Sequence, residues 1–167
     1  KMIAQIRPDF KIVVNDVLTT IKPVKKLLIP VDNMTGKANK QSIIAMHDQL
    51  NDEGAVIIFP AGEVSRISPT GVRDSKWKKG FLNLAKNAQA PIVPVFMDAR
   101  NSAFFYAVSA VYKPMSTLLL VAEMFKQAHK RMNIKVGNMI PFEHYNGLDI
   151  STDSKVRLFK KHLYNIG

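Results

Sequence analysis

Short apolar runs separated by polar turns dominate the pattern of this chain. The runs at 10–14, 27–31, 54–59, 92–97 and 134–140 predict strands. Apolar residues recur at helical spacing over 37–52, over 79–88 and after Ser151, and shorter helices are expected at the N-terminus and over 16–21. Strands that alternate with helices predict an α/β fold, with a mixed, mostly parallel sheet of five or more strands and helices on both faces.

The stretch 54–66, GAVIIFPAGEVSR, organises the chain. Its first half reads as a strand buried on both faces, and Pro60 must end that strand because proline lacks the ladder N–H. The residues that follow place a carboxylate, a hydroxyl and a guanidinium just beyond the carboxyl end of the strand. Ligands of open α/β sheets bind at that edge, so we predict a binding site there.

An isolated Pro-x-Gly turn with one surface ion pair would carry no function. Here the turn is followed by a concentration of basic residues around one tryptophan: Arg66, Arg73, Lys76, Lys78 and Lys79, with Trp77 among them. Only Asp74 opposes these charges between Arg66 and Lys79. The pattern therefore favours an anion-binding loop over an ordinary turn.

These motifs together resemble the lysophospholipid acyltransferase family, which has a Phe-Pro-Glu-Gly-Thr-Arg-Ser motif and a later Val/Ile-Pro-Val strand. The matching segments are FPAGEVSR and WKKGFLNLAKNAQAPIVPVF. Alanine before the glycine, glutamate after it, and the later RNSAFFY make the chain most similar to the haemolysin-like and ornithine-lipid-forming branch. The resemblance covers most of residues 5–143 and implies the glycerolphosphate-acyltransferase-like α/β fold.

The resemblance implies an O-acyltransferase that moves a fatty acyl group from an acyl thioester to the hydroxyl of a lysolipid in phospholipid or ornithine-lipid synthesis. Acyl-CoA or acyl-carrier protein would be the donor, and no bound cofactor or metal is expected. The implied substrate-binding residues are Phe59, Pro60, Gly62, Glu63, Ser65, Arg66 and Lys79. Gly62 would let the backbone approach the substrate, and Arg66 and Lys79 would hold a phosphate or carboxylate. Glu63 would order those cations or contact the head group, and it is the candidate for a catalytic role.

The family's catalytic pair, His-x4-Asp or His-x4-Glu, has no credible copy in this chain. His47 and Asp52 have the spacing, but five residues along a helix turn through about 140°, so the two side chains diverge. We therefore expect the pair upstream of Lys1, in a domain truncated at its N-terminus, so that this chain supplies the substrate-binding wall and is inactive alone. The alternative is a non-catalytic module that binds lipid or anions with the same fold.

A second family motif commonly ends in Asp-Arg, where the arginine helps to hold the phosphate of the acceptor. Here Asp32 matches and Asn33 replaces the arginine. This difference argues against a simple glycerol-phosphate acceptor, and Asn33 is also a common turn residue.

Composition limits the partners. Twenty-four Lys and Arg face thirteen Asp and Glu, for a formal net charge of +11 in a chain of 167 residues that is 47% hydrophobic. One domain covers residues 1–167. The charge favours a polyanionic partner, and without the interleaved aromatics of nucleic-acid modules we expect anionic lipid or a phosphorylated substrate instead. We predict peripheral attachment to the cytoplasmic face of the inner membrane, with acyl-carrier protein as a further partner.

The tract 103–125 is the most hydrophobic in the chain, and Lys113-Pro114 divides it. Neither half reaches the roughly 20 residues that span a bilayer. Two buried helices are the favoured interpretation, and a hairpin resting in the membrane surface is the alternative.

Overall fold

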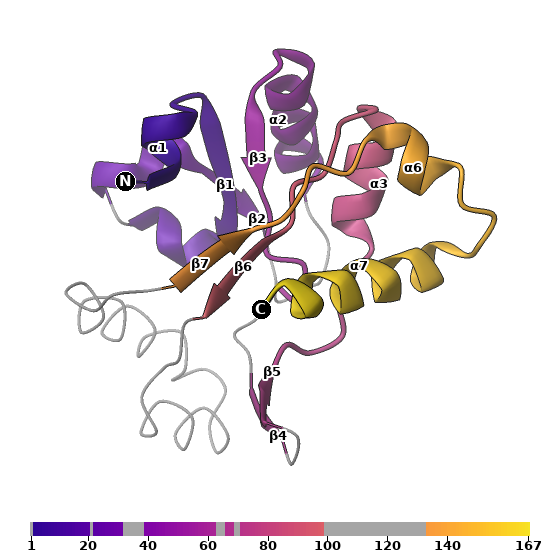
Figure 1. Cartoon of the computed structure of the whole chain (residues 1–167). Coiled ribbons are helices and arrows are strands. Elements are labelled where there is room, and N and C mark those ends of the chain that lie inside the picture. Colours follow the sequence, from indigo (N-terminus) through magenta and orange to yellow (C-terminus); the bar gives the residue numbers. More distant parts are fainter. Residues whose placement is uncertain (1, 21, 32–38, 63–65, 69–70, 99–132) are drawn as a thin grey trace.

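The structure is a computed structural model, which describes residues 2–20, 22–31, 39–62, 66–68, 71–98 and 133–167 (Figure 1). The hydrophobic tract 103–125, for which buried helices are predicted, lies outside these residues, as does the Asp32-Asn33 pair. A short helix α1 (Met2–Ile6) opens the described chain and ends before Pro8, as the sequence predicts.

A three-stranded parallel sheet forms the first half of the molecule. Its strands are β1 (Phe10–Asn15), β2 (Leu28–Val31) and β3 (Ala55–Ile57), in the order β2-β1-β3. Ile12 pairs with Leu28 on one side of β1 and with Ile57 on the other. This parallel arrangement confirms the predicted α/β class.

The connections follow from the parallel pairing, because parallel neighbours need a crossover of a dozen or more residues. Between β1 and β2 the chain makes two 3-10 helices, η1 (Asp16–Thr20) and η2 (Lys22–Leu27). The first of these helices ends before Pro23, and Pro23 lies in the first turn of η2, where proline is tolerated. The crossover from β2 to β3 contains α2 (Lys40–Asn51), whose N-cap Asn39 accepts a hydrogen bond from the Ser42 N–H.

The strand before the motif is less buried than its sequence predicts. β3 lies at an edge of the three-stranded sheet, and all three of its residues are only partly buried. Phe59, just beyond it, is 53% exposed. The prediction of a strand covered on both faces is therefore wrong for the described structure, because an unbroken apolar run does not distinguish a central strand from an edge strand.

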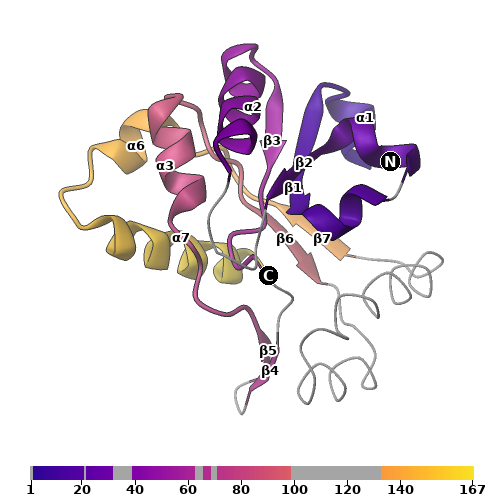
Figure 2. The ribbon, with the colours of Figure 1, turned by 180° about the vertical axis from the view of Figure 1, so that it is seen from behind.

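Two strand pairs lie outside this sheet. β6 (Val95–Asp98) and β7 (Asn133–Val136) pair antiparallel, and Ile92 bridges to Ile140 beyond them. The described pairings contain no ladder between β6 and β3. The predicted loop 60–78 contains a hairpin of β4 (Arg66–Ser68) and β5 (Gly71–Arg73), which extends away from the body in both ribbon views (Figures 1 and 2).

The second half of the molecule packs three helices around an aromatic core. These are α3 (Gly80–Asn87), α6 (Phe142–Asn146) and α7 (Thr152–Ile166). Ser151 caps α7 by accepting a hydrogen bond from the Ser154 N–H, as its sequence predicts. The core cluster contains seven buried residues: Ala61, Trp77, Leu82, Ala85, Tyr145, Val156 and Phe159. This cluster joins the motif turn to α3, α6 and α7.

Tyr145 provides a test of this core that depends on pH. It is 2% exposed, and its hydroxyl donates to the Ala90 carbonyl oxygen at 2.7 Å. Burial raises the pKa of Tyr145 above its usual value of 10.0. The stability that comes from the neutral phenol is therefore fully present below pH 10 and is lost as the pH rises through the higher folded-state pKa.

We expect Tyr145→Phe to lower the free energy of unfolding by about 1 kcal/mol at neutral pH, the typical net worth of one hydrogen bond. The variant should also lose less stability between pH 10 and pH 12 than the wild type, since it lacks the titrating group. Urea titrations followed by circular dichroism at several pH values measure both effects. An equal loss of stability between pH 10 and pH 12 in the two proteins would contradict this account of Tyr145.

Candidate functional site

The candidate site starts at the turn that follows β3. Pro60, Ala61 and Gly62 form this turn, which the Gly62 N–H closes by donating to the Phe59 carbonyl oxygen at 3.0 Å. Gly62 has a φ of +68°, a left-handed conformation that favours glycine. Because β1, β2 and β3 are parallel, the turn lies at the carboxyl edge of the sheet, where ligands of α/β sheets bind.

The buried core contacts the motif turn and holds it in place. Ala61 and Trp77 are each 7% exposed and belong to the same buried cluster. Beside them, the Lys78 N–H donates to the Pro60 carbonyl oxygen at 2.9 Å. Residues 60–62 and 77–78 are thus joined by a backbone hydrogen bond and by a shared buried cluster.

A lysine side chain covers the open side of this turn. A methyl group built at Gly62 would meet the Cε and Nζ atoms of Lys78 at 3.3 Å. The end of the Lys78 side chain therefore lies directly against the Gly62 backbone. The positive φ favours glycine at position 62, and the absence of a side chain there leaves room for the end of Lys78.

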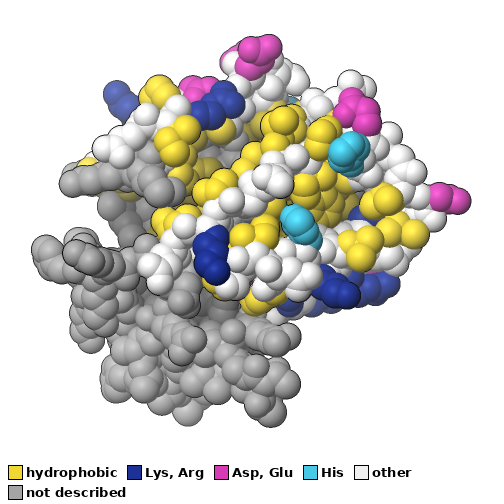
Figure 3. Space-filling view, in the orientation of Figure 1, with side chains coloured by type: hydrophobic (Ala, Val, Ile, Leu, Met, Phe, Trp, Pro, Cys, Tyr) yellow, Lys and Arg dark blue, Asp and Glu magenta, His cyan; other side chains and the backbone are white. Residues whose placement is uncertain are grey.

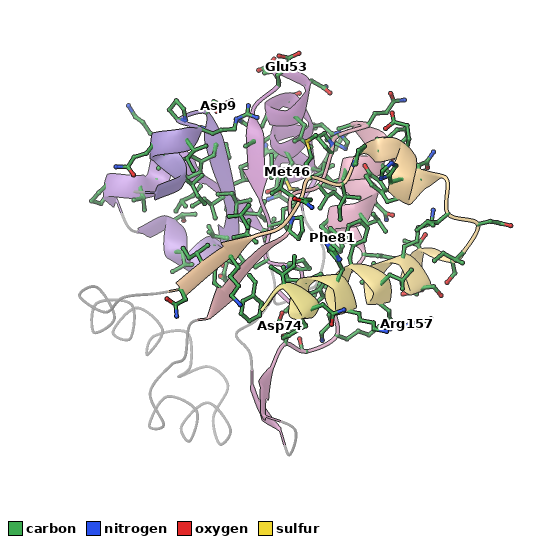
Figure 4. The ribbon with its side chains drawn as sticks, in the orientation of Figure 1. Asp9, Met46, Glu53, Asp74, Phe81 and Arg157 are labelled. Carbon is green, nitrogen blue, oxygen red and sulfur yellow. The ribbon has the colours of Figure 1, made fainter. Side chains whose placement is uncertain are left out.

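The segment 74–78 is held in turn by helix α7. Lys160 Nζ donates to the carbonyl oxygens of Asp74 and Ser75, both at 2.8 Å. The Asp74 N–H donates to the Tyr164 hydroxyl at 3.0 Å, and its carboxylate accepts from the Trp77 indole N–H at 2.9 Å. Figure 4 shows Asp74 beside α7, with Phe81 between α3 and α7. Helix α7 therefore sets the position of the basic segment against the motif turn.

The predicted site residues divide into three groups. Phe59, Pro60 and Gly62 lie together at the turn. Glu63 and Ser65 lie outside the described residues, so their roles stay predictions. Arg66 begins β4 opposite Arg73, and Lys79 is the exposed N-cap residue of α3. These positions do not test the predicted binding of substrate by Arg66 or Lys79.

The sequence interpretation missed Lys160 and Tyr164 as residues of this arrangement, and it placed Lys78 in the basic loop without a specific role. The sequence WKKG contains two adjacent lysines, and spacing alone does not say which one faces the turn. Lys160 and Tyr164 read as ordinary members of an amphipathic helix, and their contacts to residue 74 are long-range.

Three other possibilities concern a catalytic pair, a metal site and a membrane span in the described part of the chain. His47 lies within α2 and Asp52 is its C-cap residue, in agreement with their rejection as a catalytic pair. The described residues contain no group of three His, Asp or Glu side chains arranged for a metal ion. No helix among them combines the length and apolar character needed to cross a bilayer.

Two shallow cavities flank α7. One of about 230 Å³ is mainly apolar and lies between α6 and α7, where Figure 3 shows apolar side chains beside histidines. The other, also about 230 Å³, is lined by Lys76, Trp77, Asp153, Val156, Arg157 and Lys160. The second cavity opens on the same basic segment that supports the motif turn.

The described structure is an α/β protein in which a glycine turn lies at the carboxyl edge of a parallel sheet, with the end of a lysine side chain beside it. A family model described as acyltransferase matches residues 2–166. The chain belongs to this acyltransferase family, which confirms the resemblance in its motifs.

Two curated relatives are named lyso-glycine lipid O-acyltransferase. The protein of Bacteroides thetaiotaomicron is 34% identical over 142 residues, which cover 81% of this chain and 52% of the relative. The protein of Phocaeicola vulgatus is 29% identical over 144 residues, which cover 83% of this chain and 51% of the relative. The chain thus spans about half the length of the curated relatives it matches. No solved structure gives a significant match.

Proposed function

We propose that the complete protein transfers a fatty acyl group from an acyl thioester to the hydroxyl of a lyso-lipid. Family membership and the names of the two relatives support acyl transfer to a lipid. The observation that carries the proposal is the rigid turn at Gly62, because its backbone and the adjacent cation lie at the ligand-binding edge of the sheet. Acyl-CoA or acyl-carrier protein is the proposed donor.

The reaction requires a base that this chain does not identify. The acceptor hydroxyl attacks the thioester carbonyl, so that a C–O bond forms and the C–S bond breaks. A base takes the hydroxyl proton and returns it to the departing thiolate. We propose that the residues described here bind and orient the substrates for that step, while the His-x4-acid pair of the family supplies the base.

The acceptor we propose is a lyso-lipid with an amino-acid head group. Both relatives are named for a lyso-glycine lipid, and an amino-acid head group offers a carboxylate where a glycerol-phosphate acceptor offers a phosphate. The replacement of the family's arginine by Asn33 agrees with such a change of acceptor. The net charge of +11 supports work at an anionic membrane surface, on its cytoplasmic face.

The test is an assay of the complete protein with a labelled acyl thioester and three acceptors: lyso-glycine lipid, lyso-ornithine lipid and lysophosphatidic acid. We expect transfer to the amino-acid lipids and at least tenfold less to lysophosphatidic acid. In the same assay Arg66→Ala should raise the acceptor KM about 10- to 100-fold, the cost of losing a charge-assisted hydrogen bond. Absence of transfer to every acceptor would leave a lipid-binding module as the better account, and near-normal acceptor kinetics would refute the role of Arg66.

A further inference from the structure

Lys78 is the cation whose side chain ends beside the motif turn. Its backbone is anchored at 2.9 Å to the Pro60 carbonyl oxygen, and its Nζ lies 3.3 Å from the position of a Cβ atom at Gly62. Its neighbour Trp77 is locked in the core by burial and by the bond to Asp74. The backbone of Lys78 is thus held in place, and its exposed side chain ends beside Gly62.

The charge of Lys78 is not neutralised by an ion pair within the described residues. The carboxylate of Asp74, in the same segment, accepts the indole N–H of Trp77. The ion pair that the structure records, Arg7 with Asp9, joins the start of the chain to the start of β1. An ammonium group with three donors at the ligand edge of a sheet suits a carboxylate or phosphate.

We propose that Lys78 binds the anionic oxygen atoms of a substrate that enters at the Pro60–Gly62 turn. This inference rests on the proposed function and adds a specific binding residue to it. The ligand is an oxyanion group, either the carboxylate of the acceptor head group or a phosphate of the acyl donor. Gly62 keeps the turn flat enough for the ammonium group and the oxyanion to meet above its backbone.

Lys79 differs from Lys78 although the two are adjacent. Lys79 is the N-cap residue of α3, and its carbonyl oxygen accepts the Asn83 N–H at 3.1 Å. The three atoms nearest to a methyl group built at Gly62 all belong to Lys78. If one of these two lysines holds the oxyanion at the turn, the geometry favours Lys78.

The experiment compares Lys78→Met with the wild type in the complete protein. Methionine keeps an unbranched side chain over Gly62 and removes the charge. We expect KM to rise about 10- to 100-fold for one substrate, with kcat changed less than threefold. A rise for the acceptor assigns the site to its head group, and a rise for the donor assigns it to the donor's phosphates. Lys78→Arg should restore most of the loss, since the positive charge returns.

Binding without turnover separates this inference from the proposed function. Calorimetry with lyso-glycine lipid below its micelle concentration, and with an uncharged amide of the same lipid, measures the contribution of the carboxylate; coenzyme A alone probes the donor phosphates. We expect Lys78→Met to weaken binding of one anionic ligand at least tenfold and to leave the uncharged lipid unaffected. If the wild type binds these ligands as expected but transfers no acyl group, the proposed function is refuted and the binding role of Lys78 stands.

Lys86→Met is the matched control, because it removes the same charge from an exposed side chain in the last turn of α3, outside the basic loop. We expect its KM values to stay within threefold of the wild type. Kinetics and binding that are unchanged in Lys78→Met, or changed equally by Lys86→Met, would overturn the proposal. An effect of Lys79→Met without one of Lys78→Met would overturn it as well.

Discussion

Replacing Trp77 with alanine is expected to lower the free energy of unfolding by about 3–5 kcal/mol, the usual cost of emptying a large aromatic site in a core. The indole is 7% exposed and packs edge to face on Phe81, with ring centroids 5.9 Å apart. It shares its cluster with Ala61 of the motif turn. Loss of the ring should therefore loosen the turn together with the segment 74–78.

Urea unfolding of the complete protein, followed by circular dichroism, measures this loss, since the substitution removes the fluorescence of Trp77 itself. Trp77→Phe is the matched control, because it keeps an aromatic ring and removes the hydrogen bond to Asp74 at 2.9 Å. We expect it to cost less than half as much as Trp77→Ala. A loss below 1 kcal/mol in Trp77→Ala would show that the ring does not hold the core at the motif turn.

The sequence predicted those elements whose patterns are local. The strand over 10–14 and the helix after Ser151 appear as expected, because an apolar run and a capped amphipathic repeat each specify one local structure. The turn at Gly62 was also predictable, since proline ends the strand and glycine permits the positive φ that the turn adopts.

What the sequence could not predict depends on contacts between distant residues. The partner of a strand is one example: β6 pairs with β7 across the tract 99–132 instead of with the strand that precedes it. The choice between Lys78 and Lys79 is another, because it depends on how residue 78 is bonded to Pro60. The position of β3 at the edge of its sheet is a third example. Phe59, just beyond β3, belongs to an apolar run and is nevertheless half exposed.

The support that α7 gives to the site was equally hidden. Lys160 and Tyr164 are 86 and 90 residues from Asp74 in the chain, yet they bond to the backbone of that residue. Most basic residues on such a helix are solvated, so the pattern predicted a charged face. In the structure, however, Lys160 holds the backbone of Asp74 and Ser75.

Lys160→Met is expected to lower the free energy of unfolding by about 1.5–3 kcal/mol, the cost of removing a charged hydrogen-bond donor from part-buried partners. Its Nζ donates to the Asp74 and Ser75 carbonyl oxygens, both at 2.8 Å. Without it, these carbonyl groups lose this donor, and the segment that carries Lys78 is held less firmly against α7. We therefore also expect the KM of the substrate bound by Lys78 to rise.

Lys161→Met provides the matched comparison, because it removes the same charge from the next residue of α7, whose side chain is exposed. We expect Lys161→Met to change stability by less than about 0.5 kcal/mol, as surface substitutions usually do. Thermal and urea unfolding of both variants measure the difference, and salt titration separates a hydrogen bond from a general charge effect because exposed charges are screened. Equal losses in the two variants would mean that the net charge of α7 matters and that its hold on the segment 74–78 does not.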